Sequence, residues 1–343
     1  MRTRRALALL AAGALVLGGC SGADEGSDAG PDTEARDGTT TTAAETTTTL
    51  DPADPASVEA DPSPGCGTEP DVDPVGEDLP GDVEQTFTSA GVERVYRLGV
   101  PAGYDPATPT PLVVNLHGSG SDAAQASAYG DVPRRAAERG VLTVAPQGVD
   151  GVWELGDGAD TDFLNAVLDD VEARHCVDRN RVHGVGMSLG AAKIAFYACG
   201  EGDRFASLVL VTVEIFAGTC RSMPVVAFHG TDDPVVAYGE GGGTVDAAAT
   251  PNAGVPGTLA NIADWAENAG CTPDPDVSTI GDDVELRSYP GCDEGVDVAL
   301  YTIVGGGHTW PGSAIDLGPP EWTTDTVDAT ALALDWFAAH PRR

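Results

Sequence analysis

Short apolar runs alternate with amphipathic stretches from residue 94 onward. Seven runs have the length and Val-rich composition of β-strands: residues 94–100, 112–116, 141–145, 181–186, 207–213, 224–230 and 298–304. Helical spacing of apolar residues covers 123–139, 161–174, 189–199, 258–268 and 324–340. Continuously apolar strands separated by helices predict a mostly parallel sheet that helices cover on both faces. Ligands bind at the carboxyl ends of such strands, so we look for chemistry there.

The first 20 residues have a different pattern. Three arginines precede the apolar run ALALLAAGALVL, and the segment ends in LGGC at Cys20. A charged start followed by an apolar run too short to span a bilayer comfortably predicts an export signal. The LGGC ending resembles a bacterial lipobox, in which the cysteine carries the lipid; the alternative is cleavage nearby that discards Cys20. We therefore expect an exported protein, either secreted or held on the outer face of the cell membrane by a lipid anchor.

Residues 21–80 are dominated by Thr, Asp, Gly, Ala and Pro. So few large apolar side chains cannot offset the entropy lost on folding, and we predict a disordered acidic tether. The remaining residues, 81–343, form the predicted catalytic domain. The whole chain has 54 acidic and 18 basic residues, for a net charge of −36. Such a charge repels phosphate backbones, so nucleic acid is not an expected partner.

Beyond Cys20 the chain has six cysteines. An even count in an exported chain predicts three disulfides, whereas no CxxC or His-x-x-x-His pattern points to a metal. We expect no metal and no cofactor. Cys271 and Cys292 bracket a short Pro- and Asp-rich excursion and are predicted to pair. The pairing among the other four stays open: Cys66, Cys176, Cys199 and Cys220.

The segment GVGMSLGAAKI, residues 184–194, contains a G-x-S-x-G motif centred on Ser188. The motif follows a predicted strand and leads directly into a predicted helix, which is the arrangement of a nucleophile elbow. Gly186 and Gly190 allow a tight turn that holds the serine up and exposed. A serine hydroxyl needs a general base, and that base needs a carboxylate to orient it.

In this type of fold the acid and then the histidine follow the serine along the chain. His308 lies in TIVGGGHTWPG after the last predicted strand and is our candidate base, whereas His340 is assigned to a helix end and His229 to shaping a turn. The segment HGTDDPVVAY supplies two candidate acids. Asp233 is our choice and Asp232 the reserve, although an Asp also commonly caps a turn before proline.

An oxyanion hole needs two N–H donors, one of which comes from the residue after the nucleophile, Leu189. The second comes from a loop after an earlier strand. LVVNLHGSGSD places His117, Gly118 and Ser119 in such a loop, and we expect the donor to be the N–H of Ser119, with Gly118 as the alternative.

With these segments in place, the chain resembles the secreted α/β-hydrolases that group polyhydroxybutyrate depolymerase-like esterases with feruloyl and acetylxylan esterases. The resemblance runs from about residue 92 to 315 and includes PLVVNLHGSG, FHGTDDPVVAYGEGG, NAGC and YTIVGGGHTWPG. It implies the α/β-hydrolase fold, a Ser188–His308–Asp233 triad and an oxyanion hole at Ser119 and Leu189. It also suggests that Trp310 lies beside the substrate; the alternative is an ordinary packed tryptophan.

We therefore expect a serine esterase that acts through an acyl-enzyme on small-molecule or polysaccharide esters. Feruloyl-type esters of plant polysaccharide and short hydroxyalkanoate esters are the leading substrates. Two alternatives remain: a non-catalytic surface lipoprotein that binds glycan or lipid on a hydrolase fold, and a serine peptidase of the same fold. The triad does not choose among esters, because all of them present the same carbonyl group.

Overall fold

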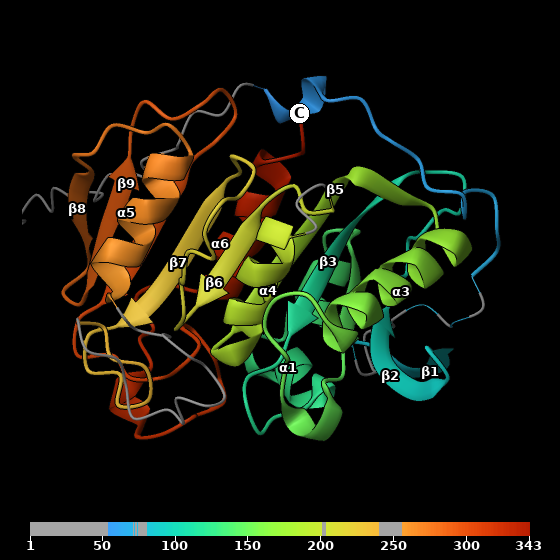
Figure 1. Cartoon of the computed structure of the whole chain (residues 1–343), viewed down its shortest axis with the longest axis horizontal. Helices are drawn as coiled ribbons and strands as arrows, with labels where there is room; N and C mark the ends of the chain where they lie inside the picture. The colour runs from blue at the N-terminus through green and yellow to red at the C-terminus, as the bar shows by residue number, and fades with distance from the viewer. Residues whose placement is uncertain (1–53, 71, 73, 75–80, 201–203, 240–255) are drawn as a thin grey trace, which may run out of the picture. The chain divides into compact units, whose positions relative to one another are not determined.

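The computed structural model describes residues 54–70, 72, 74, 81–200, 204–239 and 256–343 (Figure 1). The predicted export signal, its Cys20 and the first part of the predicted tether lie outside these residues. Across the ranges described, no helix has both the length and the apolar character needed to cross a bilayer.

One sheet organises the described part of the chain. Its strands are β1 (Val83–Ser89), β2 (Val92–Gly99), β3 (Thr110–Leu116), β4 (Leu142–Pro146), β5 (Val177–Met187), β6 (Leu208–Val211), β7 (Val225–Gly230), β8 (Asp276–Ile280), β9 (Val284–Tyr289) and β10 (Val298–Ile303). Their order across the sheet is β1-β2-β4-β3-β5-β6-β7-β10-β9-β8.

The centre of this sheet is parallel. Each neighbouring pair from β4 through β3, β5, β6 and β7 to β10 runs in the same direction. The pairs at both edges are antiparallel: β1 with β2, β2 with β4, β10 with β9, and β9 with β8. The prediction of a mostly parallel sheet is confirmed.

Helices cover both faces of the sheet. They are α1 (Ala123–Tyr129), α2 (Val132–Ala137), α3 (Ala159–Arg174), α4 (Leu189–Gly200), α5 (Thr258–Asn268) and α6 (Ala329–Ala339). Apolar side chains of α3, α4 and α5 share one core cluster, and those of α2 and α6 share the other. Figure 1 shows α3, α4 and α5 in front of the sheet and α6 behind it.

The single helix predicted over 123–139 is two helices. The chain breaks at Gly130, where an added Cβ would come within 2.5 Å of the Trp310 ring and of Thr330 Oγ1. Asp131 follows with a positive φ of 51°, and Pro133 sits in the first turn of α2. The apolar spacing of residues 123–139 is helical throughout, but close packing of Gly130 against Trp310 and Thr330 divides the stretch into two helices.

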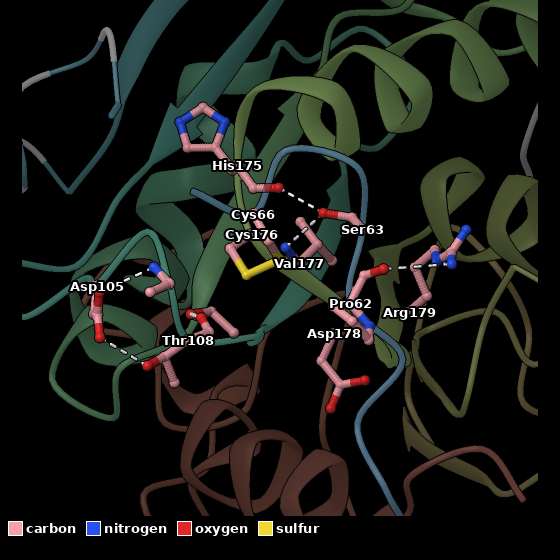
Figure 2. Close-up of a disulfide and its surroundings, with 12 residues drawn as sticks. Pro62, Ser63, Cys66, Asp105, Thr108, His175, Cys176, Val177, Asp178 and Arg179 are labelled. Atoms are coloured by element: carbon pink, nitrogen blue, oxygen red, sulfur yellow. Dashed lines mark hydrogen bonds between the residues drawn. A yellow bond between two sulfur atoms is a disulfide. The ribbon is translucent and has the colours of Figure 1, made fainter. Parts of the chain in front are cut away.

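Part of the predicted tether is folded. Cys66 forms a disulfide with Cys176, just before β5. Ser63 is buried, and its hydroxyl donates to the carbonyl of His175 at 2.6 Å and accepts from the N–H of Val177 at 2.9 Å (Figure 2). The acidic composition predicted disorder up to residue 80, but these contacts, remote in sequence, fix the segment around Cys66.

Two further disulfides lie at other places in the fold. Cys271 pairs with Cys292, as the spacing predicted. Cys199, at the end of α4, pairs with Cys220. The remaining pairings, which the sequence left open, are thus Cys66 with Cys176 and Cys199 with Cys220.

Candidate active site

Ser188 lies between β5 and α4 with a strained backbone. Its φ is 56°, in the left-handed region that residues other than glycine rarely adopt. Its N–H donates to the carbonyl of Val211 at 2.9 Å, and its carbonyl accepts from the N–H of Ala192 at 3.1 Å in the first turn of α4. A strained serine held between a strand and a helix has the geometry of a nucleophile elbow.

The two glycines of the motif are required by close backbone contacts. A Cβ on Gly186 would lie 2.5 Å from the carbonyl carbon of Gly190. A Cβ on Gly190 would overlap the carbonyl oxygen of Leu116, at the end of β3. The start of α4 can therefore approach β3 and β5 only because both positions lack a side chain.

His308 and Asp233 meet at the carboxyl end of the sheet. His308 Nδ1 lies 2.7 Å from Asp233 Oδ2, although the two residues are 75 positions apart. Asp233 follows β7, and His308 follows the neighbouring parallel strand β10. The Asp233 side chain is fully buried, whereas that of His308 is 13% exposed. A buried carboxylate bonded to a partly exposed imidazole is the pairing that a general base requires.

The structure distinguishes between the two candidate acids. Asp232 is exposed, and its carboxylate accepts from the neighbouring Thr231 hydroxyl at 3.2 Å. Asp233 Oδ1 accepts the N–H groups of Val235 at 2.7 Å and Val236 at 2.9 Å, which leaves Oδ2 for imidazole nitrogens. Asp233 both holds the turn and contacts His308, so the two roles that the sequence offered as alternatives occur together.

Strong hydrogen bonding also keeps Asp233 ionised. Burial by itself would raise the pKa of this carboxyl, but hydrogen bonds from His229 and His308 hold its pKa well below the usual range. The carboxylate is therefore charged at any pH at which the protein is expected to work.

The serine and the histidine both contact the carboxyl end of β6. The Ser188 N–H is bonded to Val211, and His308 Nε2 lies 3.5 Å from the hydroxyl of the next residue, Thr212. Thr212 has a φ of 63°, which is unusual for a β-branched side chain. Sequence reasoning missed Thr212, because nothing in the apolar run SLVLVTV marks it.

The loop after β3 passes directly beside the serine. A Cβ on Gly118 would lie 3.3 Å from Ser188 Cβ and 3.8 Å from Ser188 Oγ. Ser119, the next residue, is exposed. The expected oxyanion donors, the N–H groups of Ser119 and Leu189, thus belong to the loop that passes Ser188 and to the helix that starts directly after it.

His117 fixes the peptide between Gly118 and Ser119. His117 Nε2 accepts the N–H of Gly148 at 3.0 Å, so Nδ1 carries the proton and donates to the Gly118 carbonyl at 2.8 Å. Burial lowers the pKa of His117 and favours this neutral form. Since the N–H of a trans peptide points opposite to its C=O, His117 also sets the direction of the Ser119 N–H. A histidine directly after a buried strand was the signal that could have identified this role.

Trp310 is buried in the core. Its side chain is 1% exposed and packs in the core cluster with α2 and α6, where its Nε1 donates to Thr330 Oγ1 at 3.0 Å. This burial supports the alternative that the sequence offered, an ordinary packed tryptophan, over a residue beside the substrate. Trp322, half-buried, is the tryptophan next to the His308 loop, where a Cβ on Gly307 would overlap its ring.

No metal site accompanies these residues. Among the residues that the structure describes, no group of three or more His, Cys, Asp or Glu side chains has a metal-binding arrangement. The polar groups at the strand ends instead bond to one another and to the backbone, as described above.

The chain was compared with known families and proteins. No family model matches it. Feruloyl esterase B of Piromyces equi is 29% identical over 224 residues, which cover 61% of this chain and 41% of that protein. Feruloyl esterase C of Emericella nidulans is 27% identical over 263 residues, covering 72% of this chain and 89% of that protein.

Solved structures show the same architecture. An acetyl xylan esterase from Aspergillus awamori superimposes with a TM-score of 0.52 at 13% identity, covering 75% of this chain and 99% of that one. Together with the parallel sheet and its two helical layers, this likeness identifies the α/β-hydrolase fold.

Proposed function

We propose that this chain is a carboxylic ester hydrolase, like the feruloyl esterases that it resembles, and that Ser188, His308 and Asp233 form its catalytic triad. The observation that carries the proposal is the 2.7 Å contact between His308 Nδ1 and the buried carboxylate of Asp233, at the same carboxyl edge of the parallel strands as the strained Ser188. Asp233 orients the imidazole and leaves its Nε2 for the serine proton.

The reaction then proceeds in two halves. Ser188 Oγ attacks the ester carbonyl carbon while His308 Nε2 takes the hydroxyl proton, and the N–H groups of Leu189 and Ser119 stabilise the oxyanion. The bond to the alcohol breaks, and His308 returns the proton to the departing alcohol. Water next attacks the acyl-enzyme with His308 as base, which releases the acid and restores the serine.

We propose feruloyl-type esters of plant polysaccharide as the substrate class, because the two relatives described above are named feruloyl esterases. Short hydroxyalkanoate esters are the second class, on the resemblance of the sequence motifs. Purified protein should be assayed on methyl ferulate, p-nitrophenyl butyrate and hydroxybutyrate oligomers. A kcat/KM on methyl ferulate that exceeds the others supports the first class, and preference for the oligomers supports the second.

Ser188→Ala is the matched control for this assay. It should lower kcat on every ester by at least about 10³-fold, since only the oxyanion hole and binding remain. Absence of activity on all three esters in the wild type would favour a non-catalytic binder, and cleavage of peptides but not esters would favour a peptidase.

We also propose export with a lipid anchor at Cys20. The three disulfides fit an exported protein. Cys20 lies outside the described residues, and the LGGC motif is the support for the lipid anchor. In a bacterial host, wild-type protein should fractionate with membranes and Cys20→Ala should not; equal release of both would refute the anchor.

A further inference from the structure

A buried polar cluster lies behind Asp233 and takes no part in the proposed triad. Its centre is His229, near the end of β7, and its far side is Glu214, which follows β6. Each of these two residues is only 1% exposed. Three residues of α5 close the cluster, because Thr258 and Asn261 contact its side chains and Trp265 Nε1 donates to the Glu214 carbonyl at 3.0 Å.

Both ring nitrogens of His229 face acceptors. Nε2 lies 2.9 Å from the carbonyl of Val236 and 3.4 Å from Asp233 Oδ2. A carbonyl oxygen only accepts, so Nε2 carries a proton. Nδ1 lies 2.7 Å from Glu214 Oε2. The other oxygen of Glu214 accepts from Asn261 Nδ2 at 3.3 Å, which favours the ionised carboxylate. A charged Glu214 requires the proton on Nδ1, so the ring carries two.

The electrostatic surroundings agree with this assignment. Burial by itself lowers the pKa of His229, but Glu214 and Asp233 together raise it to about 10. Burial by itself raises the pKa of Glu214, and the charge of His229 brings it below its ordinary value. The other groups facing the ring are the Thr258 hydroxyl, 3.0 Å from Nδ1, and the edge-on ring of Tyr238 at 5.6 Å between centroids.

We propose that His229 is a positioning residue that remains doubly protonated and, together with Glu214, controls through Asp233 how strongly His308 holds its proton. This inference rests on the proposed function, because it takes Asp233 and His308 as triad members. Asp233 Oδ2 lies between two imidazole rings, one permanently charged and one that gains charge during the reaction. The fixed positive charge on His229 opposes the gain of a second positive charge on His308.

The pH profile of kcat/KM on p-nitrophenyl butyrate tests this role. His229→Gln removes the fixed charge and leaves Glu214 and Asp233 uncompensated, so His308 protonates more readily. We expect the midpoint of the acid limb to rise by about one pH unit, on the Coulomb scale of a charge a few ångströms away. Activity well above that midpoint should fall much less than activity at acid pH.

A double variant guards against misfolding of the single one. Glu214→Gln combined with His229→Gln replaces the ion pair by two amides of similar size, so no buried charge is left without a partner. The acid limb should still rise, by about half a pH unit, because the positive charge nearest Asp233 is gone.

His340 provides a matched control. Its imidazole is also buried, with Nδ1 2.8 Å from the Trp336 carbonyl and Nε2 2.8 Å from Asp297 Oδ2. Asp297 precedes β10 and so lies at the opposite end of the sheet from His308. His340→Gln should lower the melting temperature and leave the acid limb in place.

Nuclear magnetic resonance of the wild type separates this inference from the proposed function. At pH 7, His229 should give two slowly exchanging ring N–H signals that are missing from the double variant. A single N–H on His229, or acid limbs that coincide in all variants, or an equal shift in His340→Gln, would overturn the proposal. If no ester is hydrolysed, the proposed function fails, and the two N–H signals still decide the protonation state.

Discussion

Single residues at the elbow are constrained by backbone atoms, which do not move aside as side chains do. Gly190→Ala places a methyl group against the carbonyls of Leu116 and His117. We expect a loss of about 2–3 kcal/mol in the free energy of unfolding, together with lower activity as Ser188 is displaced. Denaturant unfolding measures the first effect, and esterase assays measure the second.

Gly103→Ala is the control for this substitution. An added Cβ at Gly103 meets no atom within 4 Å. Its stability should match the wild type or slightly exceed it, since alanine restricts the unfolded chain. Equal tolerance of alanine at positions 103 and 190 would show that the elbow is looser than described.

Asp232 and Asp233 are neighbours in sequence but should differ in their effect on catalysis. Asp233→Asn removes the charge that orients His308, and kcat should fall by about 10³–10⁴-fold. The exposed neighbour offers the control, because Asp232→Asn should remain within about twofold of the wild type. A larger loss from Asp232→Asn than from Asp233→Asn would exchange their roles.

Sequence reasoning proposed Ser188, His308 and Asp233 because each lies in a turn directly after an apolar strand, and the structure brings His308 and Asp233 into contact. The same reasoning could not place Trp310, since an aromatic residue beside a histidine has the same local signal whether it faces a substrate or the core. The pairing of His229 with Glu214 was also out of reach, because it depends on which strands become neighbours. Local pattern assigned His229 to the turn, where its Nε2 does bond to Val236.

At the scale of secondary-structure elements, the Cys66–Cys176 disulfide holds the segment around Cys66 in place. Composition alone predicts that this segment is disordered. The disulfide closes a loop of 110 residues, compared with 21 for Cys271–Cys292. If loop entropy dominates, replacing both cysteines of the long loop by alanine should cost about 1.5 kcal/mol more than replacing those of the short loop. Thermal unfolding of the two double variants checks this order, and the reverse order would argue against it.

The central strands and most helices could be predicted because buried parallel strands are continuously apolar and helices keep their spacing. Helix α5 has the predicted bounds, 258–268. The edge strands β1 and β8 were missed, together with β9, which lies between β8 and β10. Exposed strands such as β8 carry polar residues and lack an apolar run. The strand order depends on crossovers that no local pattern encodes.

For the molecule as a whole, a buried histidine makes stability depend on pH. His183 in β5 is 1% exposed, and burial lowers its pKa to about 3. Below about pH 6.5 the unfolded chain takes up this proton and the folded chain does not, so stability falls as the pH falls toward 3. This group should remove on the order of 3 kcal/mol between pH 7 and pH 4.

His183→Gln tests this dependence. The glutamine has no proton to gain, so the stability difference between wild type and variant should shrink at pH 4 relative to pH 7. Melting temperatures at the two pH values provide the comparison. Parallel losses in both proteins would assign the acid sensitivity to other groups.

The central claim is that Ser188 is the acylated nucleophile, and covalent labelling tests it most directly. A fluorophosphonate probe should modify the wild type once, and tryptic mapping should place the adduct on residues 182–193, in which Ser188 is the sole hydroxyl. Ser188→Ala should take up no label. An adduct on any other peptide, or labelling that persists in Ser188→Ala, would contradict the account.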